Sequence, residues 1–203
     1  MYIGRFVVAG RTAGGHSFIG YRVSSRSFPN RIIRTYPERA AVLPTQDAPP
    51  TDNPYIAYNC YRQLANMTVI GNGSQVDPIS ERLQAGYPPR DALAQTLLAL
   101  DYEHDALNTP RIAAVLDGAG QQAWFGFVGA DKLYSRVLPL EPGQAWLIAT
   151  YELTEPTPIH LPGEHAEELA DALMQCEYDL PVAGMAVVWN GGQFAVAARS
   201  VAV

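Results

Sequence analysis

Most of this chain consists of short apolar runs that are separated by tight turns. Glycine-rich breaks at residues 10–15 and 190–192 each lie between two such runs, as the turn of a β-hairpin does. Strands that are joined by tight turns pair as antiparallel neighbours, so the pattern predicts mostly antiparallel sheets. The expected strands are residues 2–9, 16–23, 55–61, 67–70, 111–116, 123–128, 134–138, 145–151, 185–189 and 194–198.

Two further stretches have the spacing of amphipathic helices. Residues 91–101 carry leucines at helical spacing after a Pro-Pro start, and residues 164–176 begin with acidic residues after a Pro-Gly pair. Residues 79–85 are a shorter candidate. Each helix needs a sheet face to cover, so we expect an α+β protein in which helices flank a sandwich of two sheets. Residues 1–203, 48% of them hydrophobic, suit one single domain.

Charge and composition narrow the possible classes of function. A net charge of -6 and a pI near 5.1 argue against nucleic-acid binding, which needs a basic face. The start of the chain lacks a signal-peptide pattern, and no apolar run approaches the roughly 20 residues of a membrane span. We therefore expect a cytoplasmic protein without membrane contact. The two cysteines and four scattered histidines fit no zinc motif, so no metal is expected.

Arginine and serine side chains concentrate in residues 21–31, directly after a strand-like run. A guanidinium donates two parallel hydrogen bonds to a phosphate or carboxylate, and hydroxyl and amide groups can donate to the same oxygens. The segment therefore predicts a binding site for an anionic group. The alternative is the basic end of a hairpin, since surface loops often carry such residues. The candidate ligands are Arg22, Ser24, Ser25, Arg26, Asn30 and Arg31.

A second polar block, residues 53–60, ends in Tyr58, Asn59 and Cys60. With the two-residue period of a strand, Tyr58 and Cys60 face one side of the sheet and Asn59 faces the other. A tyrosine hydroxyl can stabilise a developing oxyanion, and an asparagine amide can bind a carboxamide or the edge of a heterocycle. The alternatives are aromatic packing within a strand and, for Cys60, a small buried hydrophobic side chain.

Acidic residues gather where the helix of residues 91–101 is expected to end. Asp101 and Glu103 would lie near the negative end of the helix dipole, which costs stability unless a cation or a ligand compensates. A solvated acidic helix end is the alternative. The turn that follows leads from Thr109 to Arg111 at the start of the next expected strand, and both are candidates for the same site.

Five segments within the first 117 residues carry a family resemblance. They are Tyr2-Ile-Gly-Arg-Phe6, Tyr21 through Arg31, Asn53 through Cys60, Asp101-Tyr102-Glu103 and Thr109 through Ala114. In order and spacing they resemble the archaeal-type inosine monophosphate (IMP) cyclohydrolases. The resemblance implies a four-layer αββα sandwich like that of the N-terminal-nucleophile (Ntn) hydrolases, and no metal or organic cofactor. We also expect a homo-oligomer.

The resemblance also implies a reaction, the last step of purine synthesis. In that step the formamido-imidazole-carboxamide ribonucleotide (FAICAR) closes its second ring to give IMP and water. The carboxamide nitrogen attacks the formyl carbon of the same molecule, which calls for orientation, a base and stabilisation of an oxyanion. In this interpretation the arginines bind the 5′-phosphate, Asn59 the carboxamide and Tyr58 the oxyanion, while Glu103, or else Asp101, transfers the proton. Substrate binding is also assigned to Ser24, Ser25, Asn30, Cys60, Thr109 and Arg111.

Two other functions remain open at this point. An amidohydrolase of the same fold would need Cys, Ser or Thr at its mature N-terminus, where Met1 and Tyr2 stand instead. A purine-nucleotide-binding module without catalysis would keep the same pocket. Only turnover separates that module from the enzyme.

Overall fold

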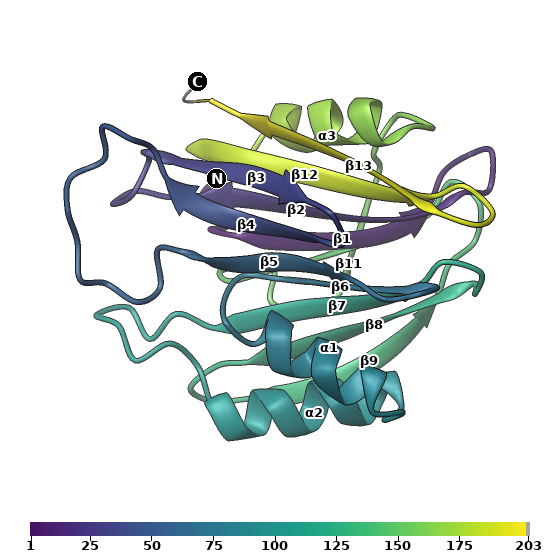
Figure 1. The fold of residues 1–203 in the computed structure, drawn as a ribbon, viewed down its shortest axis with the longest axis horizontal. Coiled ribbons are helices and arrows are strands. Elements are labelled where there is room, and N and C mark those ends of the chain that lie inside the picture. Colours follow the sequence, from purple (N-terminus) through teal and green to yellow (C-terminus); the bar gives the residue numbers. More distant parts are fainter. Residues whose placement is uncertain (202–203) are drawn as a thin grey trace.

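The computed structural model describes residues 1–201, which form two antiparallel sheets and three helices (Figure 1). The six-stranded sheet has the spatial order β11 (Thr157–Ile159), β10 (Ala145–Ala149), β1 (Phe6–Arg11), β2 (Ser17–Ser24), β12 (Pro181–Trp189) and β13 (Phe194–Ser200). The seven-stranded sheet consists of β3 (Arg31–Tyr36), β4 (Arg39–Pro44), β5 (Tyr58–Gln63), β6 (Met67–Gly71), β7 (Arg111–Asp117), β8 (Gln122–Val128) and β9 (Leu133–Pro139). The helices are α1 (Val76–Gln84), α2 (Pro89–Leu100) and α3 (Ala166–Gln175).

The elements are stacked as helix, sheet, sheet and helix. Helix α3 packs on β2, β12 and β13 at the top of Figure 1, while α1 and α2 pack on the outer face of the seven-stranded sheet at the bottom. The two sheets face each other through contacts of β1 and β2 with β6 and β7. The α+β sandwich expected from the sequence is therefore present.

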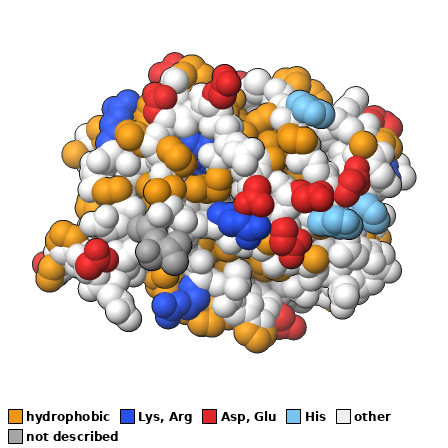
Figure 2. Space-filling view, turned by 90° about the horizontal axis from the view of Figure 1, so that it is seen from above, with side chains coloured by type: hydrophobic (Ala, Val, Ile, Leu, Met, Phe, Trp, Pro, Cys, Tyr) orange, Lys and Arg blue, Asp and Glu red, His pale blue; other side chains and the backbone are white. Residues whose placement is uncertain are grey.

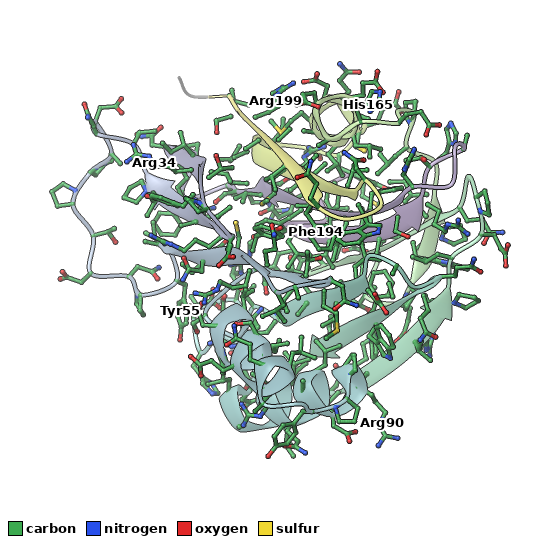
Figure 3. The ribbon with its side chains drawn as sticks, turned by 45° about the vertical axis from the view of Figure 1, so that its right-hand side comes forward. Arg34, Tyr55, Arg90, His165, Phe194 and Arg199 are labelled. Carbon is green, nitrogen blue, oxygen red and sulfur yellow. The ribbon has the colours of Figure 1, made fainter. Side chains whose placement is uncertain are left out.

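Apolar side chains fill the space between the two sheets (Figure 3). This central cluster includes Val7 and Tyr21 of one sheet and Cys60 and Phe125 of the other. Strand β2 is buried along its whole length, because the second sheet covers one of its faces and α3 covers the other. Two smaller apolar clusters lie beneath α3 and beneath the pair α1 and α2.

Both predicted hairpins are confirmed, since β1 pairs with β2 and β12 pairs with β13. The described residues contain thirteen strands rather than about ten, because β3, β4 and β11 were not predicted. Arginines interrupt the apolar pattern of the β3–β4 hairpin, which lies at a sheet edge with part of its surface exposed. The first strand begins at Phe6 and not at residue 2.

The surface above α3 is rich in acidic and histidine side chains (Figure 2). Glu167 and Glu168 lie in the first turn of this helix, where the positive end of the helix dipole favours them, and Asp171 pairs with Arg199 of β13. Among residues 1–201, no helix has both the length and the apolar character needed to span a membrane.

Candidate active site

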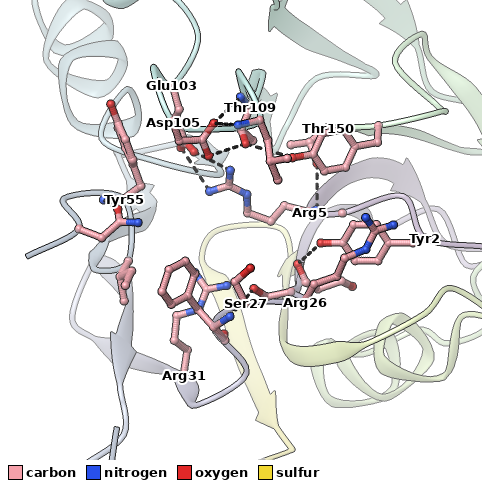
Figure 4. A pocket seen from close by; sticks show the side chains of 18 of the residues that line it. Tyr2, Arg5, Arg26, Ser27, Arg31, Tyr55, Glu103, Asp105, Thr109 and Thr150 are labelled. Carbon is pink, nitrogen blue, oxygen red and sulfur yellow. Dashed lines mark hydrogen bonds and ion pairs between the residues drawn. The ribbon is translucent and has the colours of Figure 1, made fainter. Parts of the chain in front are cut away.

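A cavity of about 480 Å³ lies at one end of the sandwich, where segments from both sheets converge. Its walls come from within residues 2–5, 24–31, 53–56, 103–109 and 150–152, which are far apart in the sequence. Figure 4 shows Arg26, Ser27 and Arg31 on one side and Arg5, Glu103, Asp105 and Thr109 on the opposite side. The cavity therefore has a basic, hydroxyl-rich side and a side where acids and a guanidinium meet.

The basic side is formed by the loop that leaves β2 and enters β3. The guanidinium of Arg26 lies 4.0 Å from the centre of the Tyr2 ring, which holds the cation over an aromatic face. Arg31 Nε donates to the carbonyl of Phe28 at 3.0 Å, and Ser25 Oγ accepts from the Phe28 amide at 3.0 Å. These local bonds shape the loop and leave the other guanidinium nitrogens available for an anion.

On the opposite side, Arg5 and Glu103 form a bidentate ion pair. Arg5 Nη2 donates to Glu103 Oε2 at 2.7 Å, and Nη1 donates to Oε1 at 3.2 Å. Glu103 is only 1% exposed, and Arg111 Nη1 lies 3.8 Å from Oε1. Burial lowers the pKa of Arg5, but the adjacent Glu103 carboxylate, together with the Tyr58 and Tyr21 hydroxyls, more than offsets this effect and the pKa is raised. Arg5 is thus a fixed positive charge in the cavity wall.

Gly4 allows the chain to carry Arg5 into this position. Its φ of 71° is in the left-handed region, and a Cβ here would overlap Thr150 Oγ1 and approach the Tyr151 ring to 2.7 Å. The close approach is fixed by two bonds: the Arg5 amide donates to Thr150 Oγ1 at 3.2 Å, and the Thr150 amide donates to the Arg5 carbonyl at 2.9 Å. Arg5 therefore lies beside the segment that contains Tyr151.

A chain of hydrogen bonds completes this side of the cavity. Asp105 Oδ1 accepts from the amides of Leu107 at 3.1 Å and Thr109 at 2.9 Å, and Oδ2 accepts from Thr109 Oγ1 at 2.7 Å. Thr109 Oγ1 lies 3.0 Å from Tyr151 Oη. Burial alone would raise the pKa of Asp105, but these bonds and the nearby Arg5 lower it.

Comparison with known proteins assigns the family. A family model described as IMP cyclohydrolase-like protein matches residues 2–193. The chain belongs to this family. It is 48% identical over 197 residues to an IMP cyclohydrolase of Natronomonas pharaonis, which covers 97% of each chain. It is 43% identical over 183 residues to one of Methanocella arvoryzae, 90% of each chain, and 41% identical over 197 residues to one of Methanococcus maripaludis, 95% of this chain and 97% of the relative.

The cavity of this family member contains six of the residues that the sequence predicted for the site. They are Ser24, Ser25, Arg26, Arg31, Glu103 and Thr109. Arg111 lies directly behind Glu103 and donates through Nε to the carbonyl of Asp101 at 2.8 Å. Asn30 lines a smaller neighbouring cavity of about 250 Å³, which shares Ser27, Phe28 and Arg31 with the larger one.

Arg22 does not reach the cavity. Its side chain is fully buried beneath α3, where Nη1 donates to the carbonyls of Leu173 at 3.1 Å and Cys176 at 2.8 Å, and Nη2 donates to that of Tyr178. Burial lowers its pKa. This guanidinium therefore satisfies carbonyls at the C-terminal end of a helix, an arrangement that the dipole favours.

Residues 58–60 alternate between the two faces of β5 as the sequence predicted. The Tyr58 hydroxyl lies 2.7 Å from the Tyr21 hydroxyl, and Cys60 donates to the carbonyl of Ala40 within the core between the sheets. Asn59 points to the other face, where its amide donates to both oxygens of Asp77 on α1. None of the three residues lines the cavity.

Asp101 also lies outside the lining of the cavity. It ends α2 with a φ of 56°, and its carboxylate accepts from the Tyr102 amide at 2.9 Å and lies 3.5 Å from His104 Nε2. The helix end turns here and carries Glu103 inward while Asp101 stays half-buried.

The lining residues that the sequence did not predict include four whose charged or hydroxyl groups shape the chemistry of the cavity, namely Tyr2, Arg5, Asp105 and Tyr151. Tyr2 and Arg5 lie in the first segment of the family resemblance, so the sequence marked this segment without assigning either residue to the site. Asp105 belongs to the acidic group after α2. Tyr151 has no local signal, because it reaches the site only through pairing across the six-stranded sheet.

Proposed function

We propose that this protein is an IMP cyclohydrolase, which closes the ring of FAICAR to give IMP and water in purine biosynthesis. The observation that carries the proposal is the family match over residues 2–193, with IMP cyclohydrolases as relatives along nearly the whole chain. The protein is then a hydrolase of the class that acts on C–N bonds of cyclic amidines. A cavity of about 480 Å³ supports the proposal, since small-molecule sites usually measure about 300–1,000 Å³.

The two sides of the cavity suit the two ends of this substrate. FAICAR carries a phosphate at one end and the reacting carboxamide and formamido groups at the other. Arg26 and Arg31, with the serines around them, suit the phosphate, because a guanidinium forms strong bidentate bonds with phosphate oxygens. Binding of the phosphate there fixes the position of the imidazole ring, and the binding energy helps to orient the reacting groups.

The reaction itself needs a proton-transfer group and an oxyanion donor. When the carboxamide nitrogen attacks the formyl carbon, a C–N bond forms, the amide loses a proton, and water leaves from the carbinolamine. Glu103 is our first candidate for moving these protons, with Asp101 second, since each oxygen of Glu103 can accept from Arg5 and still offer a second lone pair. Arg5, which lines the cavity, is better placed than Tyr58 to stabilise the oxyanion, because Tyr58 is bonded to Tyr21.

We further propose that residues 1–203 form one domain with the four-layer αββα architecture of the Ntn hydrolases, and that the protein acts in the cytoplasm as a homo-oligomer. The order of helix and sheet layers supports the architecture. Light scattering tests the oligomer: a mass that is a multiple of 22.1 kDa supports it, and 22.1 kDa itself contradicts it.

An absorbance assay with purified protein and FAICAR tests the reaction. Conversion to IMP at a rate far above the uncatalysed one is the expected result. Tight binding of IMP without turnover would indicate a nucleotide-binding module instead. Release of formate, leaving the 5-amino compound, would indicate an amidohydrolase.

A further inference from the structure

The hydrogen bonds among Asp105, Thr109 and Tyr151 have a direction that follows from their chemistry. An ionised carboxylate can only accept, so the bond of 2.7 Å between Thr109 Oγ1 and Asp105 Oδ2 uses the single proton of the threonine hydroxyl. The low pKa of Asp105, which its own hydrogen bonds maintain, keeps it ionised at neutral pH. Thr109 Oγ1 therefore has only lone pairs left for its other neighbour.

That neighbour is Tyr151 Oη, 3.0 Å away. Since Thr109 has no proton left to give, Tyr151 must be the donor in this bond. Burial raises the pKa of Tyr151, so its hydroxyl has a proton to donate. Among residues 1–201, Tyr151 Oη has no other hydrogen-bond partner, and Tyr151 lines the cavity.

We infer that Tyr151 is a specificity-determining residue that presents only hydrogen-bond acceptor capacity to the cavity and selects ligands with an N–H group at that point, such as a primary carboxamide. Asp105 and Thr109 are positioning residues, because they fix the direction of the Tyr151 hydroxyl. A carboxylate at the same point would meet lone pairs and leave its oxygen unpaired. The inference rests on the proposed function, since it names how that site distinguishes the substrate's amide from an acid.

The position of Tyr151 agrees with this role. The Arg5–Glu103 pair lies on the same side of the cavity, and the close approach at Gly4 places Arg5 next to residues 150 and 151. An amide bound there can receive a hydrogen bond on its oxygen from a guanidinium and give one from its nitrogen to Tyr151. A donor and an acceptor side by side are what a carboxamide needs.

Paired ligands test the inference in the full-length protein. One is 5-aminoimidazole-4-carboxamide ribonucleotide, and the other is the same nucleotide with a 4-carboxylate. The ratio of their dissociation constants, measured by calorimetry, reports the preference for the amide. We expect the parent to prefer the amide by about ten- to a hundredfold, which corresponds to one hydrogen bond gained or lost in a buried site.

Thr109→Val changes the direction of the tyrosine hydroxyl without changing any charge. It removes the acceptor of Tyr151, whose hydroxyl can then donate into the cavity, so the preference for the amide should fall about tenfold or more. Thr109→Ser keeps the hydroxyl and is the matched control, which should retain the parent ratio. A parent-like ratio in Thr109→Val would overturn the inference.

Asp105→Asn is a second, independent test of the inferred direction of the Tyr151 hydroxyl. Oδ1 accepts two backbone amides, so the asparagine oxygen will occupy that position and its NH₂ will donate to Thr109. Thr109 then donates to Tyr151, and Tyr151 donates into the cavity. Because this variant also removes a negative charge, it is compared with and without Tyr151→Phe. A drop in preference that disappears when Tyr151→Phe is present supports the inference; an equal drop in both backgrounds, or none, contradicts it.

The same preparations separate this inference from the proposed function. If the parent closes FAICAR but binds amide and carboxylate ligands equally, the inference fails and the function stands. If the parent prefers the amide and the variants lose that preference, while FAICAR is not converted to IMP, the inference stands and the function fails.

Discussion

At the scale of single residues, burial and existing partners separate arginines that lie close together in the sequence. Arg22 already donates to three carbonyls beneath α3, whereas Arg26 and Arg31 line the cavity. The three residues had looked equivalent as phosphate ligands, because a sequence shows the type of side chain but not which partners it has. Of the three, only Arg26 and Arg31 line the cavity and can donate to a group bound there.

Removing either cavity arginine should weaken nucleotide binding. We expect Arg26→Ala and Arg31→Ala each to raise the Kd for IMP by roughly 10- to 100-fold, because a charge-assisted hydrogen bond contributes about 1.5–3 kcal/mol. Lysine should restore only part of the affinity, since it lacks the planar fork. Arg34→Ala on β3 is the matched control, because Arg34 lines a separate groove with Arg199 (Figure 3). Parent-like IMP affinity in both alanine variants would rule out this phosphate site.

Glu103→Gln should separate catalysis from binding. The change keeps the shape of the side chain and removes its basicity, so kcat should fall about a hundredfold or more, the usual contribution of a general acid–base group. The Kd for IMP should change far less. Glu81→Gln on the exposed side of α1 is the control, and thermal melting of both variants checks that they fold. Near-parental turnover would rule out Glu103 as the proton-transfer group and leave Asp101, the second candidate.

Cys60 should matter for packing and not as a nucleophile. Its thiol is fully buried between the sheets, and burial raises its pKa, so little reactive thiolate forms at neutral pH. Cys60→Ser should therefore keep most of the turnover. Iodoacetamide should modify the half-buried Cys176 before Cys60, as intact mass and peptide mapping will show. A covalent adduct of Cys60 with the substrate would contradict this mechanism.

At the scale of elements, Arg22 connects β2 to the end of α3. Its guanidinium satisfies carbonyls that the helix leaves without intrahelical partners. We expect Arg22→Met to lower the free energy of unfolding by about 2–4 kcal/mol, because these buried carbonyls lose their donor. Urea denaturation followed by circular dichroism measures the change, with Arg22→Lys as the variant that keeps a charge. If IMP affinity fell as far as in Arg31→Ala with unchanged stability, Arg22 would be a phosphate ligand after all.

The elements that the sequence predicted are those in which apolar side chains recur at the regular spacing of a strand or a helix. Residues 58–60 alternate as expected because one face of β5 packs into the core and the other meets α1. The β3–β4 hairpin was missed because Arg31, Arg34 and Arg39 break the apolar pattern at a sheet edge. For such a strand, neighbouring strands decide the structure more than its own residues do.

Residues that line the cavity were predictable where their own segment carries the chemistry, as in residues 24–31 and at Glu103. Tyr151 could not be predicted, because it reaches the cavity through β10, which pairs with β1, and through the absence of a side chain at Gly4. Its hydrogen-bond direction depends on Thr109 and Asp105, more than 40 residues away in the sequence. Long-range pairing of this kind produces no periodic pattern in the sequence.

At the scale of the whole molecule, the order of strands makes one sheet depend on both ends of the chain and places the other sheet between them in the sequence. The six-stranded sheet contains β1 and β2 from the start of the chain and β10 to β13 from its end, while β3 to β9 between them form the other sheet. Neither half of the chain contains a complete six-stranded sheet, and the largest apolar cluster combines residues of both sheets. The cavity likewise needs segments from both sheets.

This arrangement predicts that the protein unfolds as one cooperative unit, although many chains above about 150 residues do not. Its three tryptophans allow a test for each sheet: Trp124 lies on β8, and Trp146 and Trp189 lie on β10 and β12. One variant keeps only Trp124 and another only Trp146, with phenylalanine at the remaining positions. The fluorescence and circular-dichroism midpoints in urea should coincide within each variant. Both signals are recorded at the same protein concentration, because the stability of an oligomer depends on concentration. A fluorescence transition of the Trp124 variant that precedes its own circular-dichroism transition would mean that the seven-stranded sheet unfolds separately, and the chain would then consist of two folding units.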